Sequence, residues 1–578
     1  MNNYQEFKII DNIAKLIESS FGIHGKLKLI SQVFDHKNDE GENDNVVNST
    51  QKIIFTNDGL LIFKSLNNDS PYYKIILQQS NYIKNRFGCG VSQYIILTNN
   101  ILKRSIKLIN NKGSSSSSTS TFSINQILNI FQECRLFIKN NFNERFIINL
   151  KDEIFSSSGG KNDQLLESII KTNLSKNILS IYFKRISKIF KKLIKILPNL
   201  DKNKIKIKTI ISSNEDHNNN NEDEDEKKEE EDDDDNDEIE IKLLNGILIK
   251  SKFSFAGRDK LIKVIENPKI LLLDYEIELK HQKEFANIEI SNVNDYLEFI
   301  NAEKSLISKQ LENIYNLNIN LILNKKVIGD LAIQEFVKIS SQNQNNNNKI
   351  NCIGSINNIN EFEFIKKSIG GNTQSSLQNL SLDSSFYGTC KKYKQIIIGK
   401  KSYELFEGCQ FSDTQTIILK GSSKKFLKEA KLGLESLLTI FRSIIIDDDF
   451  KFVGSSSNFE FIIINLLNEL IKNKQNSSSS SSSSLSTNLI KEVLIIKSLQ
   501  KSIKDIIKLL LLNSDLNLDL IDQLFQINNN NNNSCINIEE NKIGDILDLN
   551  LFEPKSMKLS ILNSSIETSC ILLKTITT

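Results

Sequence analysis

The sequence predicts an α+β protein of several domains, in which helical segments at both ends of the chain flank a central α/β segment. Three observations support this fold class. The 578 residues exceed what one hydrophobic core commonly holds. Apolar residues recur at helical spacing towards both ends, and β-rich runs alternate with helical patterns between them. Long Asn and Ser runs bury little apolar area, so we interpret them as loops or disordered inserts.

The first part of the chain is expected to be mostly helical. Apolar residues at helical spacing begin at Phe7, and Gly22 can end that helix because glycine accepts the left-handed conformation. A β-rich run and then Asn57-Asp58-Gly59 follow, which is a turn signal between two apolar segments. The β-rich run spans residues 52–56, and further helices are predicted at 72–86, 94–109, 124–140 and 165–197, the last ending before Pro198.

The centre of the chain has a different pattern. The β-rich runs are residues 239–249, 270–273, 287–290 and 320–323, and they alternate with helical patterns at 293–317 and 330–337. Such alternation indicates an α/β unit. A further β-rich stretch spans 395–420, before helical patterns return at 424–445, 459–474, 489–512 and 559–573. This palindromic order suggests that the chain leaves its first domain and later returns to complete it.

The composition excludes several classes of protein. The seven Cys are scattered, odd in number and without a CxxC pair, so neither a disulfide framework nor a zinc site is expected, and a reducing compartment fits. The four His share no spacing with one another or with Cys. No stretch approaches the roughly 20 apolar residues of a spanning helix. We therefore expect a soluble, cytoplasmic protein without a transmembrane segment.

The net charge of +2 conceals a strong asymmetry. Residues 222–238 carry 14 acidic side chains and two lysines, a local charge of −12, so the rest of the chain carries +14. An acidic run of this kind is usually a solvated, self-repelling loop. The alternative is an electrostatic tether for a basic partner.

Three short motifs stand out in the first part of the chain. Residues 54–64 read IFTNDGLLIFK, which is similar to the TNDG-x-x-I-L-K segment of the group II chaperonin family. Gly88-Cys89-Gly90-Val91-Ser92 stands where the family carries GDGTT. Residues 20–28, SFGIHGKLK, occupy the place of its S-L-G-P-x-G-M-D-K loop.

The resemblance continues in order towards the other end. Residues 246–249 (GILI) and 268–274 (PKILLLD) look like the start of the family's apical domain. Residues 406–409 (FEGC), 416–421 (TIILKG) and 552–554 (FEP) resemble its F-x-x-G-C, T-I-L-L-R-G and W/F-E-P segments. Each motif is weak alone, but their common order makes chance agreement an unsatisfactory explanation.

The resemblance implies a chaperonin fold of three domains. A mostly helical equatorial domain would be built from residues 1–150 and 422–578, and a small intermediate domain from 151–212 and 364–421. Residues 239–363 would form an α/β apical domain, with a disordered acidic insert at 213–238. By the same resemblance, the apical domain binds non-native or assembling client proteins. The equatorial domain contacts other chaperonin subunits or chaperonin-like proteins and binds ATP or ADP with magnesium.

A basic amphipathic helix is expected over residues 183–195, with apolar side chains on one face and lysines on the other. Such a helix can lie on a membrane or pack its apolar face against a core. Because it falls in the presumed intermediate domain, the core-facing alternative is preferred. No nucleic-acid module accompanies it, and no nucleic-acid partner is expected.

Two residues depart from the chemistry that the resemblance implies. The family holds magnesium through the Asp of GDGTT, which is Cys89 here, and a neutral thiol is a poor ligand for a cation that prefers oxygen. The family's general base, in E-A-x-R-A-L-x-D-A-L, corresponds to Ser436 within EAKLGLESLL. Glu435 is adjacent but points about 100° around the helix. We therefore assign no catalytic residue and expect ATP hydrolysis to be lost or very weak.

Nucleotide binding is a separate matter, because part of the loop pattern is retained. The candidate nucleotide-binding residues are Gly22, Asp58, Gly59, Gly88, Gly90, Ser92 and Gly454. Asp58 is also the candidate metal ligand, although a carboxylate in this turn serves turn geometry as readily. Gly454-Ser455-Ser456 replaces a GGG of the family, which puts side chains near the nucleotide. Residues 158–161 (SGGK) lack the spacing of a phosphate loop.

Three functions remain open. The preferred one is a chaperonin-like protein with a degenerate ATP site that assists protein folding or complex assembly through its apical surface, as in the McKusick–Kaufman and Bardet–Biedl chaperonin-like proteins that it resembles. The first alternative is an active ATP-dependent ring subunit that folds unfolded proteins. The second is a helical scaffold without a chaperone role.

Overall fold

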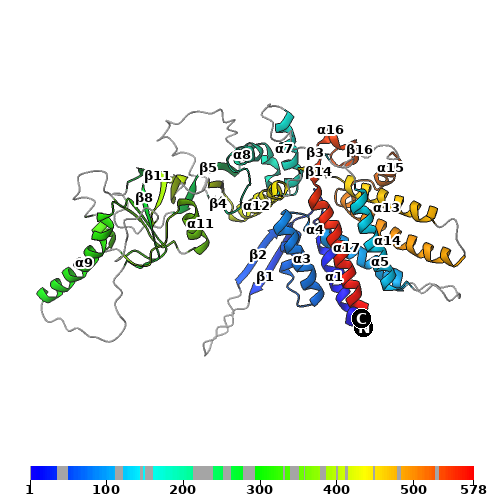
Figure 1. Cartoon of the computed structure of the whole chain (residues 1–578), viewed down its shortest axis with the longest axis horizontal. Helices are drawn as coiled ribbons and strands as arrows, with labels where there is room; N and C mark the ends of the chain where they lie inside the picture. Colours follow the sequence, from blue (N-terminus) through cyan, green and yellow to red (C-terminus); the bar gives the residue numbers. More distant parts are fainter. Residues whose placement is uncertain are drawn as a thin grey trace. The chain divides into compact units, whose positions relative to one another are not determined.

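A computed structural model of the protein describes most of the chain (Figure 1). The described residues are 2–34, 50–110, 122–142, 148–149, 161–211, 239–250, 262–277, 293–329, 332–336, 338, 350–356, 358–377, 386–398, 401–409, 414–446, 450–477, 483–527 and 533–577. The chain divides into two compact units. The first contains residues 1–190 and 428–578, and the second contains residues 191–427.

The first unit is mostly helical, and its helices come from both ends of the chain (Figure 1). The helices before the second unit are α1 (Asn2–Glu18), α2 (Gly59–Ser65), α3 (Pro71–Phe87), α4 (Val91–Asn110), α5 (Ile124–Asn141), α7 (Lys161–Leu174), the 3₁₀ helix η2 (Ile178–Tyr182) and α8 (Phe183–Ile196). Those after it are α12 (Lys424–Ile446), α13 (Asn458–Ser477), α14 (Ser483–Asn513), α15 (Asp519–Ile527), α16 (Ile546–Leu549) and α17 (Lys555–Thr577).

The core of the first unit is centred on α4. Its N-terminal half is buried almost completely, including the polar residues Gln93, Thr98 and Asn99, whereas Lys103, Arg104 and Lys107 of its second half are not buried. It packs against α1, α14 and α17. The hydroxyl of Tyr94 donates to the hydroxyl of Thr568 at 2.9 Å, which joins α4 to the last helix of the chain. Residues from the two ends of the sequence therefore form one hydrophobic core.

Short strands complete the first unit. They are β1 (Lys28–Phe34) paired antiparallel with β2 (Thr50–Thr56), the three-stranded sheet of β17 (Phe552–Pro554), β14 (Lys451–Gly454) and β3 (Ile148–Asn149), and the hairpin of β15 (Ser534–Asn537) and β16 (Lys542–Asp545). The middle sheet again pairs the early strand β3 with the late strand β14.

The second unit contains two sheets. In the smaller one, β13 (Gln415–Gly421) lies between β4 (Ile205–Ile211), which is parallel to it, and β5 (Ile239–Asn245), which is antiparallel. The larger sheet has the order β10 (Asn351–Ile353), β9 (Leu321–Asn324), β8 (Lys269–Leu273), β11 (Gly388–Ile398), β12 (Lys401–Cys409) and β6 (Ile247–Lys250), and β7 (Val264–Glu266) also pairs with β11.

Two helices pack against opposite faces of the larger sheet. Along β8, Leu271 and Leu273 pack with α9 (Val293–Asn316), whereas Ile270 and Leu272 pack with α11 (Ile359–Ile369). Alternate residues of a strand point to opposite faces, so a strand covered on both faces must be apolar throughout. This explains the continuous apolar run that the sequence shows here.

The apolar face of α8 is buried and its lysines are exposed, as in the core-facing alternative. Ile186, Phe190 and Leu193 are buried, and the ring of Phe190 lies 5.3 Å from that of Phe441 on α12. Among the described residues, no helix is both long enough and apolar enough to cross a bilayer.

Two local predictions were wrong. The first helix ends at Glu18, before Gly22. The turn predicted at Asn57-Asp58-Gly59 does separate two apolar segments, β2 and α2, and Asp58 also caps the N-terminus of α2. The helix predicted over 165–197 is broken into α7, η2 and α8, since the side chain of Asn177 accepts from the N–H of Leu179 and starts a new helical turn.

Several predictions concern residues outside the described ranges. These are the acidic insert at 213–238, the Ser run at 113–120, residues 158–160 of the SGGK segment and the β-rich run at 287–290. The division of the chain at residues 150, 212, 363 and 421 into equatorial, intermediate and apical domains remains a prediction.

Candidate functional site

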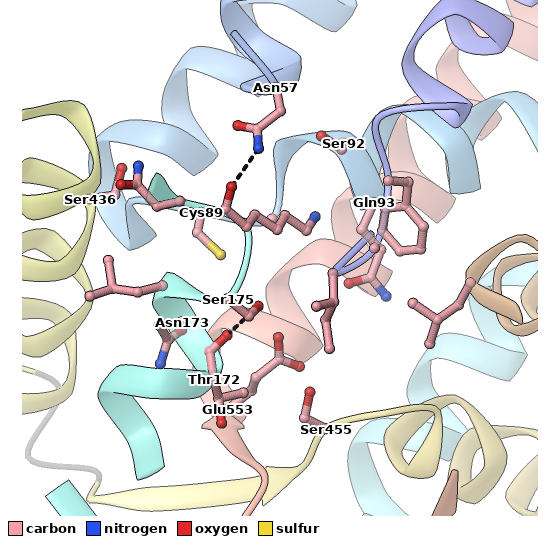
Figure 2. Close-up of a pocket in the computed structure, with 18 of the residues that line it drawn as sticks. Asn57, Cys89, Ser92, Gln93, Thr172, Asn173, Ser175, Ser436, Ser455 and Glu553 are labelled. Carbon is pink, nitrogen blue, oxygen red and sulfur yellow. Dashed lines mark hydrogen bonds between the residues drawn. The ribbon is translucent and has the colours of Figure 1, made fainter. Parts of the chain in front are cut away.

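The first unit contains a cavity of about 500 Å³, which Figure 2 shows from close by. Its wall is built from short segments rather than from one element. They are the loop after α1, the start of α2, the α3–α4 turn, the α7–η2 connection, one face of α12, the β14–α13 turn, part of α14, the β15–β16 turn and the start of α17. These segments meet because helices from both ends of the chain share one core.

The α3–α4 turn forms one side of the cavity and requires glycine at two positions. Gly88 has φ +76° and Gly90 has φ +91°, in the region that side chains disfavour. A Cβ on Gly88 would lie 2.4 Å from the carbonyl oxygen of Ser436, and one on Gly90 would lie 2.3 Å from Cδ1 of Ile561. The backbone of this turn therefore packs closely against both α12 and α17.

Cys89 lies between these two glycines and lines the cavity (Figure 2). Its Sγ is 3.9 Å from Sδ of Met557. Desolvation, with a smaller contribution from the negative charge of Glu553, raises the pKa of the Cys89 thiol, so the side chain is neutral near pH 7. A neutral thiol among these groups offers little to a hard cation.

Asp58 uses both carboxylate oxygens within the protein. Its Oδ1 accepts from the N–H of Leu60 at 2.9 Å, which caps α2. Its Oδ2 accepts from the ammonium of Lys84 at 2.7 Å. The hydroxyl of Thr56 accepts from the Asp58 N–H at 3.0 Å and fixes the turn. Each oxygen of the carboxylate thus accepts a hydrogen bond from within the protein.

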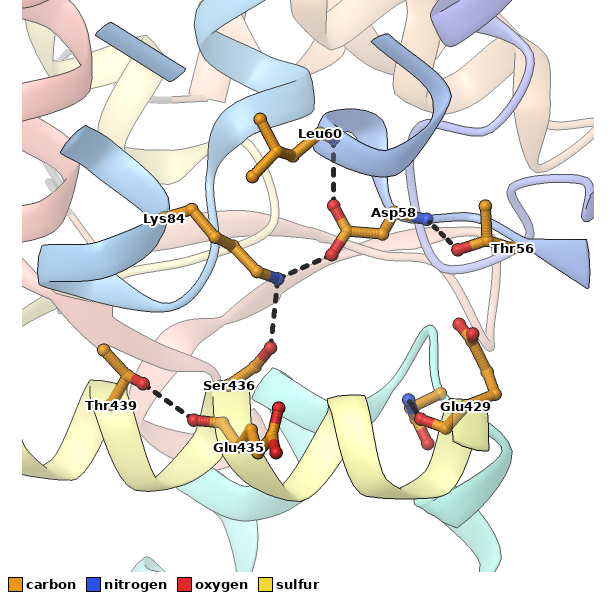
Figure 3. A network of polar contacts seen from close by, with 9 residues as sticks. Thr56, Asp58, Leu60, Lys84, Glu429, Glu435, Ser436 and Thr439 are labelled. Carbon is orange, nitrogen blue, oxygen red and sulfur yellow. Dashed lines mark hydrogen bonds and ion pairs between the residues drawn. The ribbon is translucent and has the colours of Figure 1, made fainter. Parts of the chain in front are cut away.

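Lys84 connects Asp58, at the start of α2, with Ser436 on α12, as Figure 3 shows. It lies in the last turn of α3, and its ammonium donates to Asp58 and, at 3.0 Å, to the hydroxyl of Ser436 on α12. Residues 84 and 436 are 352 positions apart in the sequence. The side chain of Lys84 is 23% exposed and that of Asp58 is 14% exposed, so this is a largely shielded ion pair.

These residues do not fit a magnesium ion. An ion bound to Asp58 would lie close to the Lys84 ammonium, and a divalent cation 4 Å from a unit positive charge is repelled by roughly 8 kcal/mol at an effective dielectric constant of 20. Within the described part of the chain, no group of three His, Cys, Asp or Glu side chains could hold a metal. Lysine already supplies the positive charge that the carboxylate needs.

The carboxylates on α12 do not replace the missing ligands. Glu435 is about half exposed, pairs with Lys431 at 3.8 Å and does not line the cavity. Glu429 does line it and is buried. Burial, and then the negative charge of Asp58, raise the pKa of Glu429, although Lys84 opposes this effect. Ser436, at the expected position of a general base, carries only a hydroxyl.

A second lysine in the wall is surrounded by acceptors. The ammonium of Lys558 lies 3.2 Å from Glu460 Oε1, 2.7 Å from Glu553 Oε2 and 3.2 Å from Gln93 Oε1. Its side chain is 8% exposed. Burial alone would lower the pKa of Lys558, but the two glutamates raise it above its usual value, so the ammonium stays charged.

The β14–α13 turn adopts a left-handed backbone without glycine. Ser456 has φ +49° and Ser457 has φ +76°. The Ser456 hydroxyl donates to the carbonyl of Ile536, which holds the turn against β15. Ser457 is 4% exposed and lines the cavity, yet its Oγ has no hydrogen-bond partner among the described residues. A buried hydroxyl without a partner is unusual in a folded protein.

The structure places most of the predicted site residues around this one cavity. Those in its wall are Gly22, Asp58, Gly59, Gly88, Cys89, Gly90, Ser92 and Ser436. Gly454 is not in the wall. A Cβ there would lie 2.1 Å from Cδ1 of Ile546 and 2.7 Å from Oδ1 of Asn458, so this glycine permits close packing beside the cavity.

The sequence interpretation missed the lysines. Lys84 lies one helical turn before Gly88, and that spacing was a signal that its side chain could reach the turn. Lys176, whose ammonium lies 4.9 Å from the centre of the Phe21 ring, and Lys558 come from distant segments and carry no comparable signal.

Comparison with known proteins adds an independent finding. The model of the TCP-1/cpn60 chaperonin family matches residues 40–576 of the chain. The chain is 36% identical over 200 residues to T-complex protein 1 subunit eta of Tetrahymena thermophila, covering 35% of this chain and 53% of that protein.

Two longer matches cover more of the chain. Identity is 26% over 403 residues with T-complex protein 1 subunit eta of Tetrahymena pyriformis, covering 69% of this chain and 63% of the relative. It is 25% over 397 residues with the Saccharomyces cerevisiae protein of that name, covering 69% and 64%. The matches thus span between about half and somewhat under two thirds of the length of these relatives.

Proposed function

Because the chain belongs to the TCP-1/cpn60 chaperonin family, we propose that it assists the folding or assembly of other proteins through its apical surface without turning over ATP. One observation carries the second half of this proposal. The ammonium of Lys84 joins Asp58 to Ser436 at the place where the family's chemistry calls for carboxylates and a metal. The negative charge of Asp58 is thus neutralised by the Lys84 ammonium of the same protein.

Hydrolysis of a phosphoanhydride needs an oriented water and a cation that neutralises the developing charge. Cys89 is neutral, Asp58 is engaged by Leu60 and Lys84, and Ser436 has no carboxylate to take a proton from water. Together these features support a cavity without turnover. These three features affect ATP hydrolysis only. They do not prevent other parts of the protein from binding client proteins.

Exposed apolar side chains in the second unit support a client-binding role. The first turn of α9 carries Val293, Tyr296 and Leu297, which are 76%, 53% and 51% exposed. Such side chains, close together on one helix, offer a surface for the apolar segments of a non-native protein. The clients proposed are non-native or assembling proteins of the cytoplasm.

Two measurements test this proposal. Purified protein should show no magnesium-dependent ATPase activity above that of an Asp58→Ala variant. It should also suppress aggregation of a denatured test protein, with or without ATP. The triple variant Val293→Ser, Tyr296→Ser, Leu297→Ser should lose this suppression, whereas the matched control Leu136→Ser, at a 57% exposed position of α5, should retain it. Turnover that requires Asp58, or equal suppression by the triple variant, would contradict the proposal.

A second candidate is favoured by the relatives. The relatives are named as subunits of T-complex protein 1, so this chain is also a candidate ring subunit that works beside ATP-hydrolysing neighbours. The McKusick–Kaufman and Bardet–Biedl type of protein would instead form a smaller assembly. Sedimentation of tagged protein from cells separates the two: a ring-sized particle containing other chaperonin subunits supports the first, and a small complex supports the second.

A further inference from the structure

We infer that Cys390 and Cys409, which face each other on neighbouring strands of the larger sheet, form a modification site where a small disulfide compound such as oxidised glutathione creates a protein disulfide. The pair lies in the second unit, so this site goes beyond the proposed function and is independent of the cavity in the first unit. No sequence motif marks the pair, because 18 residues separate the two cysteines.

The register of β11 and β12 places the two cysteines directly opposite each other. Cys390 pairs with Cys409 in this antiparallel ladder, whereas Cys535 faces Gly544 on β16. Opposed residues of antiparallel strands have Cα atoms about 4.5 or 5.5 Å apart, according to their hydrogen bonding. Both separations fall within the range of about 4.4–6.8 Å that disulfides span. A bond between the two sulfurs therefore requires no change of register.

The two side chains also share one environment. Opposed residues of a strand pair project towards the same face of the sheet, where their side chains interact. Both cysteines pack against the apolar cluster that lies between the larger sheet and α11. A negative charge on Cys409 contributes to the raised pKa of Cys390, which agrees with two neighbouring sulfurs.

The present contacts of the thiols are weak and easily exchanged. The Cys390 thiol donates to the carbonyl of Lys392, with 3.6 Å between sulfur and oxygen, and the Cys409 thiol donates to the carbonyl of Phe406 at 3.7 Å. A thiol is a weak donor, so little is lost when its hydrogen is removed.

Gly408 allows the backbone beside the pair to adjust. Its φ of +63° is strained for any other residue, and a Cβ there would lie 2.7 Å from Cδ of Lys391. The glycine therefore permits a close approach of β11 and β12 next to the cysteines. A small local adjustment can then bring the two sulfurs into bonding geometry.

The two thiols differ in access, which sets the order of the chemistry. Cys409 is partly buried, whereas Cys390 is 4% exposed. Burial raises the pKa of Cys409 to about 11, and burial with a smaller contribution from the Cys409 charge raises that of Cys390 to about 12. Cys409 therefore reacts first, and its small thiolate fraction makes the reaction slow near pH 7.

The reaction consists of two thiol–disulfide exchanges. The Cys409 thiolate attacks one sulfur of oxidised glutathione, whose S–S bond breaks as a mixed disulfide forms and one glutathione leaves as a thiolate. The Cys390 thiolate then attacks the Cys409 sulfur and displaces the second glutathione. The protein loses two protons and two electrons, and the small disulfide is reduced to two thiols. Thiols of high pKa are poor leaving groups, so the protein disulfide forms slowly and also resists reduction.

The test uses the full-length folded protein in glutathione buffers of increasing oxidised fraction, near pH 8. Reaction is stopped with acid, remaining thiols are alkylated, and mass spectrometry of the digest identifies the linked peptides. We expect Cys390 joined to Cys409. Cys390→Ser should stop at the mixed disulfide on Cys409, and Cys409→Ser should form no link. Cys570→Ser, at another partly buried cysteine, is the matched control and should keep the link.

A comparison with unfolded protein makes the test stricter. The equilibrium constant for forming the link should be roughly ten-fold or more larger in the folded protein than in urea, because the sheet holds the two sulfurs together. In the oxidised protein, the amides of β11 and β12 should exchange more slowly with deuterium.

Three results would overturn the inference. They are no joined peptide in the folded natural protein at any oxidised fraction, an equal or larger equilibrium constant in urea, or a link from Cys390 or Cys409 to a different cysteine. The first two need no variant, so a serine variant that fails to fold leaves the test intact. None of these results concerns aggregation suppression or ATP turnover, so failure here is distinguishable from failure of the proposed function.

Discussion

Lys84 and Lys558 line the same cavity, but their surroundings differ in one decisive respect. Lys558 is 8% exposed and is ion-paired with two carboxylates, those of Glu460 and Glu553, besides its hydrogen bond to Gln93. Lys84 is 23% exposed, and among the described residues its partners are one carboxylate and one serine hydroxyl. The number of carboxylate partners therefore separates a lysine that neutralises two acidic groups in the core from one that neutralises a single carboxylate.

The largest effect is expected from Lys558→Met. This variant leaves Glu460 and Glu553 buried without their counter-ion, and breaking a buried ion pair costs about 3–5 kcal/mol. Urea denaturation should show the loss as a lower midpoint. Lys508→Met, at an exposed position of α14, should change the free energy of unfolding by no more than about 0.5 kcal/mol. Equal midpoints for the two variants would show that the Lys558 cluster is not structural.

Lys84→Met should cost less, about 1–2 kcal/mol. Asp58 keeps its hydrogen bond from Leu60 and gains some access to water, so its charge is not left isolated. The same urea experiment measures this difference. A loss as large as that of Lys558→Met would mean that the two lysines play the same structural role, and the comparison would fail.

Ser457→Gly should stabilise the protein by about 0.5–1 kcal/mol, because glycine adopts φ +76° without the strain of a side chain. It also removes a buried hydroxyl that has no described partner. Thermal unfolding detects the gain. Ser456→Gly, which instead breaks the hydrogen bond to Ile536, is the contrasting variant and should not stabilise the fold to the same extent.

The smallest effect is expected from Glu429→Gln and depends on pH. The folded state raises the pKa of Glu429 above the ordinary glutamate value of 4.5, so the folded state binds more protons than the unfolded chain. Stability conferred by this residue is therefore complete below pH 4.5 and falls as pH rises through the folded pKa. The variant should match the natural protein near pH 4 and unfold at a slightly higher temperature near pH 7. The opposite order near pH 7 would show that Lys84 outweighs burial at this site.

Local signals in the sequence anticipated much of the secondary structure. The helices α3, α4 and α5 and the strands β8 and β9 lie within a few residues of their predicted bounds, because apolar periodicity reports which side chains face a core. The break after Leu174 was missed because Asn177 starts η2 through its own side chain, which periodicity does not register. The helix cap formed by Asp58 was not anticipated, since turns and helix caps use the same residue types.

The site was harder to anticipate than the fold. The order of motifs directed attention to Asp58, the glycine turn and Ser436, and all of them line one cavity. The role of Lys84 depends on a contact between positions 352 apart, which no local pattern encodes. The Ser457 hydroxyl has no hydrogen-bond partner within the described part of the chain, and this depends likewise on contacts between distant segments.

The two parts of the first unit come from opposite ends of the chain, which affects how this unit folds during synthesis on the ribosome. Residues 191–427 must be synthesised between the two parts of that unit. At about 5–20 residues per second this interval lasts roughly 12–50 s. During that time α4 lacks the faces of α14 and α17 that cover it, and the second unit can fold first. A member of a chaperone family is thus itself a nascent chain with a long period of exposed apolar surface.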